Sequence, residues 1–483
     1  MAAAPDPVYP LGYVRGIDGF RGVAILLVLF FHTSPRFTGG YLGVDLFFVL
    51  SGFLITGILL REDSADGRGL LDFYRRRALR LLPALVAFCL LFLAFAFAAL
   101  PDFRAALTDV FVSLTSVANW TRAFNLGVPR QLGHMWSLSI EDQFYLLWPV
   151  ILFALIRYAG RRGALAATIV LIVACAGWRV WLALQGATVE RLYNGFDTRC
   201  DTLLVGCALA LSGIGRPDRI PPAVATMVRV LWLPCAVALI AIMAAFQWGD
   251  RAMFLGGYTL VALLAAVLIL ATLQQTLFAR MMEYGPLVAT GRISYALYIW
   301  HYPVWFVLHV DYGVSMMASG LLTIPLSFAA AAVSYFVVER PFLRLRYANG
   351  RSTRMIGPAA VGFMAGAFAF GLVYFVAPAT LSRIFERPGE IVDFGPRQIA
   401  LGESFNRQPS GNSAMWIKTR SIPANARIQF NGTLLNTVVT DTVLTAEIPG
   451  ALLAQTGPLP IVLVSPQGQV LAGPVTFEIK ASP

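Results

Sequence analysis

The fold follows from the segment IDGFRGVAILLVLFFHTSP, residues 17–35, which is long and apolar enough to cross a lipid bilayer as a helix. Similar runs recur along most of the chain, and 58% of all residues are hydrophobic while 13% are charged, against roughly 25% charged in soluble domains. The pattern excludes a soluble globular protein and predicts an all-α polytopic membrane domain of about 11 transmembrane helices. The further predicted spans are residues 41–60, 81–100, 141–156, 163–183, 201–215, 229–248, 253–274, 291–310, 313–338 and 355–377.

Positive charge lies in the loops between these runs, which is the distribution that membrane orientation produces. The net charge is +11, yet Lys418 and Lys480 are the only lysines, and the arginines gather in short connecting segments rather than in one nucleic-acid-binding surface. Counted from a cytoplasmic N-terminus, inner loops carry about three times as many arginines as outer loops. We therefore expect a multi-pass plasma (inner) membrane protein with a cytoplasmic N-terminus and no nucleic-acid partner.

The character of the sequence changes after the last apolar run. Residues 378–413 are rich in Pro, Gly, Arg and Glu without sustained periodicity, which predicts a linker. Residues 414–483 contain short alternating runs broken by turn pairs such as Asn431-Gly432, which predicts a small β-sandwich. An odd number of spans that starts inside must end outside, so we expect residues 1–377 to form the transmembrane domain and the β-sandwich to be extracytoplasmic.

Two ionisable residues of the first span are functional candidates, because a charge inside a span costs roughly 2.5–3.5 kcal/mol. Arg21 and His32 share one helix face and lie about 16 Å apart along the helix axis. This spacing resembles the arm of coenzyme A: Arg21 would grip a nucleotide phosphate near the cytoplasm, and His32 would meet the thioester towards the outer side. The structural alternatives are an arginine that snorkels at a helix end and a buried, hydrogen-bonded histidine.

A second candidate is the arginine-rich segment FYRRRALRLLP, residues 73–83, at the cytoplasmic start of the third predicted span. Arg77 and Arg80 are three residues apart and share a helix face, and guanidinium groups bind phosphate through paired hydrogen bonds. Arg292 is a further arginine at this inner level. The alternative is an ordinary positive-inside anchor.

The third candidate is the segment HMWSLSIEDQFYLLWP, residues 134–149, which opens the fourth span from the outer side. Glu141 and Asp142 lie near the N-terminal end of that helix, where the macrodipole favours carboxylates, and capping alone explains one of them. His134 falls at the same outer level as His32. We expect the residues that bind or support a substrate at this outer level to include Asp45, Trp136, Ser137, Tyr145, Arg199, Asp201 and His301. His301 is equally compatible with packing.

At these residues the sequence resembles the acyltransferase 3 family of integral-membrane acyltransferases. The matching segments GFRGVAILLVLFFH, YLGVDLFFVLSGFLIT, RRRALRLLPA, HMWSLSIEDQFYLLWP, GRISYALYIWHYP and VERP occur in the family's order over residues 10–346. Asp142 stands where the family often has a second Glu, which keeps the acid. The family's motif positions fall on Arg21, His32, Arg77, Arg80 and the segment from Trp136 to Glu141.

The resemblance implies transfer of an acyl group, with acetyl the expected one, from cytoplasmic acyl-CoA to a hydroxyl of an extracytoplasmic glycan, glycolipid or similar acceptor. We then expect His32 to act as general base on that hydroxyl, with Glu141 orienting or charging the imidazole and Asp142 beside it as a further acid. A transient acyl-histidine is the open alternative. The expected partners are membrane lipid, acyl-CoA and a carbohydrate. No metal is expected, because the five cysteines contain no CxxC pair.

The β tail is similar to Ig-like IPT/TIG modules, which implies binding or scaffolding. An esterase role is excluded for this tail, because no histidine follows His309 and a Ser-His hydrolase needs one. Two rival functions stay open: a transporter or flippase for a lipid-linked or sugar substrate, and a membrane anchor that displays the tail as an adhesin. The sequence has no visible internal repeat, which a carrier built from inverted repeats would show.

Overall fold

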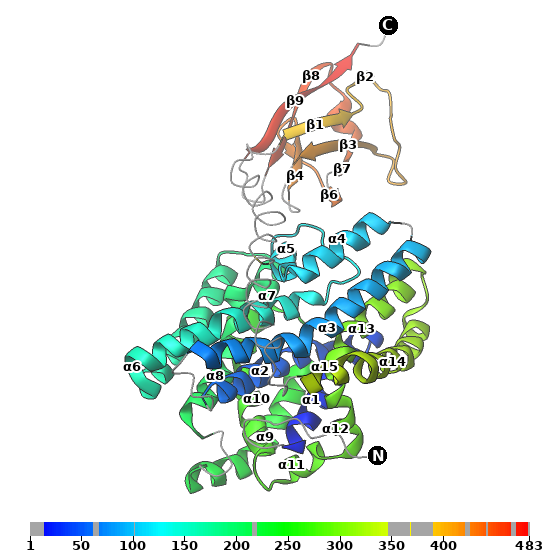
Figure 1. Ribbon diagram of the computed structural model, residues 1–483. Helices are drawn as coiled ribbons and strands as arrows, with labels where there is room; N and C mark the ends of the chain where they lie inside the picture. The colour runs from blue at the N-terminus through cyan, green and yellow to red at the C-terminus, as the bar shows by residue number, and fades with distance from the viewer. Residues whose placement is uncertain are drawn as a thin grey trace. The chain divides into compact units, whose positions relative to one another are not determined.

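The computed structural model divides the chain into two compact units, Met1–Val376 and Ala377–Pro483 (Figure 1). The structure describes residues 14–60, 67–100, 102–214, 220–345, 368, 390–420, 426–440, 443–464 and 470–481. The first unit is helical. Its elements are α1 (Arg15–Thr33), η1 (Thr38–Leu42), α2 (Gly43–Leu59), α3 (Gly67–Ala99), α4 (Phe103–Leu114), α5 (Ala118–Ala123), α6 (Met135–Leu184), α7 (Val189–Asn194), α8 (Phe196–Ser212), α9 (Pro222–Ala245), η3 (Met253–Gly257), α10 (Tyr258–Thr272), α11 (Leu277–Met282), α12 (Gly285–Arg292), α13 (Ser294–Phe306), η4 (Val307–Asp311), α14 (Met316–Val333), η5 (Ser334–Glu339) and α15 (Arg340–Leu345).

Seven helical segments of the described residues are long and apolar enough to cross a membrane, which confirms the helical membrane character that the sequence predicts. They include α1 with its paired Arg21 and His32, and α3 with its arginine-rich start. The seven segments are Arg15–Thr33, Thr38–Leu59, Gly69–Ala99, Met135–Leu184, Pro222–Ala245, Met253–Thr272 and Met316–Leu343.

The number of spans differs from the number of predicted runs for identifiable reasons. Helix α6 joins two helices at Gly160, whose φ of 66° and ψ of 178° are not helical, and it contains two predicted runs, one on either side of that residue. The runs 201–215 and 291–310 correspond to the shorter helices α8 and α12 to α13. The run 355–377 lies outside the described residues apart from residue 368. The total of eleven spans therefore stays a prediction.

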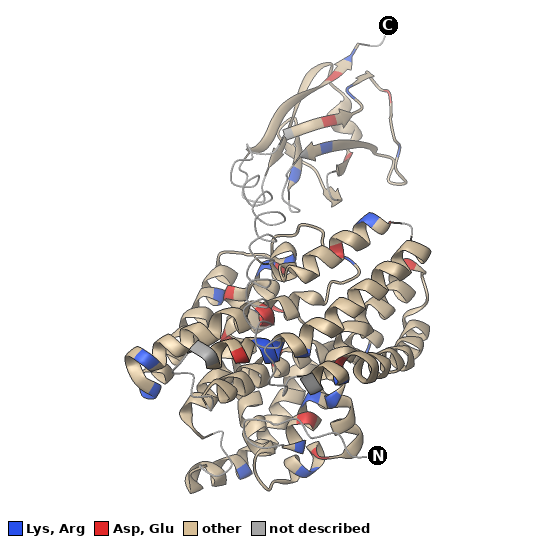
Figure 2. Cartoon of the chain, in the orientation of Figure 1, with Lys and Arg blue, Asp and Glu red and all other residues tan. Residues whose placement is uncertain are grey.

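The outward faces of the helical unit are apolar, as surfaces in contact with lipid must be. Leu90 and Phe97 of α3 and Ile240 of α9 have exposed fractions of 63%, 79% and 65%. Figure 2 shows that the helices carry few charged residues over most of their length. So much exposed apolar surface is uncommon on a soluble monomer, and it supports a membrane environment.

Helix α8 packs against both α2 and α6, and its contact with α2 is a backbone contact. A Cβ atom on Gly52 of α2 would lie 1.9 Å from the carbonyl oxygen of Leu203, and one on Gly206 of α8 would lie 1.9 Å from the carbonyl oxygen of Val49. Glycines at such crossings let two helix backbones approach closely, which is how helices associate when lipid removes the hydrophobic driving force.

The second unit contains two β-sheets that share one hydrophobic core. One sheet has the strand order β1-β3-β7-β6, and the other has the order β2-β9-β8-β4-β5. All pairings are antiparallel except that of β2 with β9. The strands are β1 (Glu390–Gly395), β2 (Gln398–Ala400), β3 (Ser413–Arg420), β4 (Arg427–Phe430), β5 (Thr433–Leu434), β6 (Thr437–Thr440), β7 (Val443–Ile448), β8 (Gly457–Val464) and β9 (Val470–Lys480).

The β unit begins earlier than the sequence predicts. Strands β1 and β2 lie inside residues 378–413, which we expected to be a linker. These strands are short and flanked by Gly and Pro, and their partners β3 and β9 lie further along the chain, so local periodicity does not reveal them. The expected Asn431-Gly432 turn is present: both residues have positive φ, 46° and 80°, as a tight two-residue hairpin requires. The Ig-like assignment stays a prediction.

The α2–α8 crossing yields a test of the fold. We expect Gly52→Val to lower the melting temperature sharply, because overpacking costs typically about 1–3 kcal/mol and here the added carbons meet a backbone carbonyl. Gly57→Val is the matched control in the same helix, since nothing lies within 4 Å of a Cβ atom at that position. Thermal unfolding of both variants in detergent, followed by size-exclusion chromatography, measures the difference. Equal melting temperatures would contradict the close contact.

Candidate active site

Three histidines from distant parts of the chain meet in the helical unit. His32 comes from α1, His134 from the residue before α6, and His301 from α13. The ring centroids of His32 and His301 are 5.2 Å apart, and those of His134 and His301 are 5.6 Å apart. His134 and His301 are buried, whereas His32 is half-buried. The sequence predicts His32 and His134 at one level, and the structure adds His301 between them.

Backbone carbonyl groups determine which nitrogen of two of these rings carries hydrogen. The Nδ1 atom of His32 lies 2.9 Å from the carbonyl oxygen of Val28, and that of His301 lies 2.7 Å from the carbonyl oxygen of Tyr298. A carbonyl oxygen only accepts hydrogen bonds, so Nδ1 must be the donor in both rings. In the neutral form each Nε2 atom therefore has a free lone pair, which is the form a general base needs.

Aromatic side chains surround the histidines. The ring of Tyr302 lies 5.0 Å from that of His32, and the ring of Trp305 lies 5.7 Å from it. The hydroxyl groups of Tyr298 and Ser137 are hydrogen-bonded to each other. Ser137, which the sequence predicts at the acceptor site, thus lies beside the histidines through its contact with α13.

The segment that carries His134 is anchored by a buried carboxylate. Asp109 of α4 accepts hydrogen bonds from the backbone N–H groups of Arg130, Gln131 and Leu132, with N–O distances of 2.9, 2.6 and 3.1 Å. Burial raises the pKa of the Asp109 carboxyl group above its ordinary value, while the three N–H donors act in the opposite direction. This anchor, which the sequence analysis did not identify, fixes the backbone two residues before His134.

The predicted arginines gather at a second site. Arg21 of α1 donates from Nη2 to the Ser294 hydroxyl oxygen at 2.9 Å. The carboxylate of Asp18 lies between two of the arginines, 4.0 Å from Nη1 of Arg21 and 3.8 Å from Nε of Arg292. Asp18 therefore balances part of the positive charge from the first turn of α1.

Helix α3 adds two arginines to this group. Arg80 and Arg21 both lie within electrostatic range of Glu339. Arg77 and Arg21 both lie within electrostatic range of Glu141. The four arginines predicted to bind a phosphate-bearing donor thus converge from three helices, and we call Arg21, Arg77, Arg80 and Arg292 the arginine cluster.

Glu141 contacts the arginine cluster rather than the histidines. Its Oε2 atom accepts a hydrogen bond from the Tyr145 hydroxyl at 2.7 Å and lies 4.0 Å from Nη2 of Arg77. The Tyr145 hydroxyl also contacts Ser51, and the Arg77 guanidinium stacks 3.6 Å from the Tyr145 ring centre. Among the described residues no contact joins Glu141 to His32, the partner we expected for it from the sequence.

Helix geometry explains this difference. Glu141 is seven residues after His134, which places it two turns, or about 10 Å, deeper along α6. The neighbouring Asp142 turns elsewhere and accepts a hydrogen bond from the Ser116 hydroxyl at 2.9 Å.

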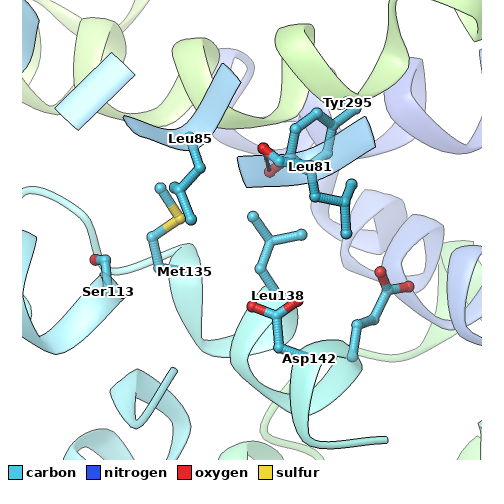
Figure 3. A pocket seen from close by; sticks show the side chains of 8 residues that line it. Leu81, Leu85, Ser113, Met135, Leu138, Asp142 and Tyr295 are labelled. Atoms are coloured by element: carbon cyan, nitrogen blue, oxygen red, sulfur yellow. Dashed lines mark hydrogen bonds between the residues drawn. The ribbon is translucent and has the colours of Figure 1, made fainter. Parts of the chain in front are cut away.

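A small pocket lies beside the first turns of α6 (Figure 3). Met135, next to His134, and Glu141, which contacts Arg77, both line it. Figure 3 shows that its walls are mostly leucine, methionine and tyrosine side chains, with Asp142 on the α6 side. The lining residues are Leu81, Leu85, Ser113, Met135, Leu138, Glu141, Asp142 and Tyr295.

Two predicted residues of the acceptor level form a buried ion pair. Nη2 of Arg199 lies 2.8 Å from Oδ1 of Asp45, and both side chains are fully buried. The Arg199 guanidinium lies 3.7 Å from the ring centre of Tyr258. Trp136 packs near this site through Tyr193, with the two ring centroids 4.7 Å apart.

Asp201 forms a second buried ion pair. It pairs with Arg179 of α6 at 2.7 Å, and both side chains are fully buried. The sequence analysis missed Arg179, although the rule that identified Arg21, a charge inside an apolar run, applies equally to this residue in the run 163–183. Among the described residues, no group of three or more His, Cys, Asp or Glu side chains is arranged to hold a metal ion.

Comparisons with known proteins match most of the helical unit. A family model described as an acyltransferase domain matches residues 14–339, which include both clusters. The chain is 32% identical over 396 residues to the Bacillus subtilis protein YrhL, a candidate peptidoglycan O-acetyltransferase; the match covers 74% of this chain and 62% of that protein. No solved structure matches the chain significantly.

Two further relatives carry related names. The chain is 29% identical to the O-acetyltransferase OatA of Staphylococcus aureus, over 70% of this chain and 58% of that protein. It is 30% identical to the peptidoglycan O-acetyltransferase OatA of Listeria monocytogenes, over 71% of this chain and 57% of that protein. The chain spans about three fifths of the length of these relatives.

The Asp45–Arg199 pair yields a stability prediction. Breaking a buried ion pair from one side costs about 3–5 kcal/mol, because the remaining charge stays in a site without water. We expect Asp45→Leu and Arg199→Met each to lower the melting temperature, and the double variant to recover a large part of the loss. Arg157→Met, at an exposed position, is the control. Additive losses in this double-mutant cycle would show that the two side chains do not depend on each other.

Proposed function

This chain belongs to the family of acyltransferase domains, and from that premise we propose that it is a membrane O-acetyltransferase. It moves an acetyl group from cytoplasmic acyl-CoA to a hydroxyl of an extracytoplasmic glycan. The observation that carries the proposal is α1 itself, one uninterrupted helix that holds Arg21 in the arginine cluster and His32 among the histidines. The printed names of the relatives favour a peptidoglycan hydroxyl as the acceptor.

The arginine cluster supplies the donor site. Phosphate groups bind guanidinium forks through charge-assisted hydrogen bonds, and the diphosphate and ribose phosphate of acyl-CoA offer several such acceptors. Asp18, Glu141 and Glu339 balance part of the positive charge of the arginines.

His32 carries the chemistry. Its Nε2 lone pair takes the proton of the acceptor hydroxyl while the hydroxyl oxygen attacks the thioester carbonyl carbon. The carbon–sulfur bond then breaks, the ester forms, and the departing thiolate takes up the proton. Positioned acid–base catalysis of this kind contributes about 10²–10⁴-fold to the rate.

A covalent route through His32 is the alternative. In that route Nε2 itself attacks the thioester and holds the acyl group before the acceptor arrives. Incubating the protein with radiolabelled acetyl-CoA and no acceptor separates the two routes. Stoichiometric label on His32 supports the acyl-histidine, and an unlabelled protein that still transfers acetyl when acceptor is added supports the general base.

The two clusters also support a membrane orientation. The arginine cluster belongs on the cytoplasmic side, where acyl-CoA is made available and where the arginine bias of the loops points. The histidines then lie towards the outer side, and the β unit is extracytoplasmic. The β unit is a binding or scaffolding module in this arrangement, and the acyl transfer itself resides in the helical unit.

Substitutions in the two clusters should have different kinetic effects. We expect Arg21→Gln to raise KM for acetyl-CoA about 10- to 100-fold, because hydrogen bonds to charged groups are worth about 1.5–3 kcal/mol, with a smaller effect on kcat. His32→Ala should abolish transfer in folded protein. Label transfer from acetyl-CoA to muropeptides in proteoliposomes measures both, with Arg157→Gln, an exposed arginine, as the control. Transfer by His32→Ala at the wild-type rate would refute the role of His32.

Removal of the β unit separates the enzyme from the anchor hypothesis. We expect a chain that ends at residue 383 to retain acetyl transfer, because both clusters lie within residues 14–345. The same proteoliposome assay measures this. A membrane-inserted, folded truncation with no transfer at any acceptor concentration would indicate that the helices serve the β unit instead.

A further inference from the structure

We propose that His301 is the second imidazole of the reaction centre, and that its Nε2 atom shares the proton which His32 removes from the acceptor hydroxyl. The inference rests on the proposed function. It assigns a role to His301, for which the sequence is equally compatible with packing and with a functional role. The main observation is that the rings of His32 on α1 and His301 on α13 lie side by side, with their centroids 5.2 Å apart. In each ring, Nδ1 is hydrogen-bonded to a backbone carbonyl group.

The first argument is the unused nitrogen of His301. The ring is fully buried, and its Nε2 atom has no hydrogen-bond partner among the described residues. A buried polar atom without a partner costs about 1–3 kcal/mol. Both ring nitrogens of His134 share this property, and His301 differs in that its ring contacts that of His32. Because Nδ1 donates to Tyr298, and also lies 3.2 Å from the carbonyl oxygen of Leu297, Nε2 is the acceptor.

The second argument is that no carboxylate in the described part of the chain contacts His32. A catalytic histidine is commonly oriented and stabilised by a carboxylate, and here the nearby candidates are engaged elsewhere. Glu141 binds Tyr145, Asp142 binds the Ser116 hydroxyl, and Asp109 binds backbone N–H groups. Of the described residues, Phe31, His301, Tyr302 and Trp305 have rings in contact with His32, and His301 alone of these four offers a basic nitrogen.

The proton balance is simple. The acceptor O–H bond breaks as its oxygen bonds to the thioester carbonyl carbon, and the proton moves to Nε2 of His32. The imidazolium of His32 then shares or passes this proton to Nε2 of His301, which keeps the positive charge spread over two rings while the tetrahedral intermediate exists. When the carbon–sulfur bond breaks, the proton goes to the thiolate, and both rings return to their neutral forms.

His301 acts through His32, so it is a positioning residue, and its test must separate proton sharing from structure. In His301→Asn the side-chain amide nitrogen replaces Nδ1 and keeps the hydrogen bond to Tyr298, but the Nε2 lone pair is lost. His309→Asn is the matched control: its Nδ1 atom also contacts a backbone carbonyl, that of Val314, at 2.8 Å, and its ring contact is with Trp305 rather than with His32.

We expect His301→Asn to lower kcat for acetyl transfer about 100-fold, at the lower end of general-base effects, with KM for acetyl-CoA changed less than about threefold. His309→Asn should keep kcat within about threefold of wild type. His301→Gln, which places an amide near the Nε2 position without a basic nitrogen, serves as the second variant if the asparagine variant does not fold, and the same loss is expected.

Rescue provides a readout that a structural role would not give. We expect added imidazole to restore part of the kcat of His301→Gly in a saturable manner, because the small base enters the space left by the ring. His301→Asn or His301→Gln with kcat within threefold of wild type would overturn the proposal. Failure of wild-type protein to transfer acetyl, or full activity of His32→Ala, would instead refute the proposed function, so the two outcomes are distinguishable.

Discussion

The rigidity of α1 is the constraint on which the rest of the site depends. An α-helix rises about 1.5 Å per residue and does not shorten, so Arg21 and His32 stay about 16 Å apart whatever the neighbouring helices do. α1 runs from Arg15 to Thr33 without a proline or a break. In the proposed reaction, a donor bound to the arginine cluster would therefore always extend over the same distance to the histidines.

Backbone contacts keep α1 in its place. A Cβ atom on Gly19 would lie 1.6 Å from the carbonyl oxygen of Met282, and one on Gly291 of α12 would lie 1.7 Å from the carbonyl oxygen of Asp18. The same contact brings Arg292, at the end of α12, beside the Asp18 carboxylate. Packing and electrostatics are thus coupled here: the glycines that allow the helices to touch also bring together part of the arginine cluster.

Sequence reasoning predicted which arginines come together better than it predicted the partners of single residues. Hydropathy and helix rise placed Arg21 and His32 on one face and gathered the four arginines at one level, and the structure places those arginines together. The partner of Glu141 was not predictable, because two turns of α6 separate it from His134 and the rotation of one helix about another is set by packing that no single sequence displays. The strands β1 and β2 were not predicted for a related reason, since each pairs with a strand that lies further along the chain.

The order of polar and apolar residues along α6 is consistent with separate proposed roles for the arginine cluster and the histidines. Its first turns begin beside His134, continue along an apolar pocket lined by Met135 and Leu138, and reach Glu141 beside Arg77. A molecule that is strongly charged at one end and reactive at the other fits such a sequence of surfaces better than a uniformly polar solute does. A carrier would need polar groups along its whole path to replace the hydration of its substrate. Separated polar clusters suit the proposed group transfer, in which the phosphates of the donor would stay at one cluster and the acyl group would react at the other.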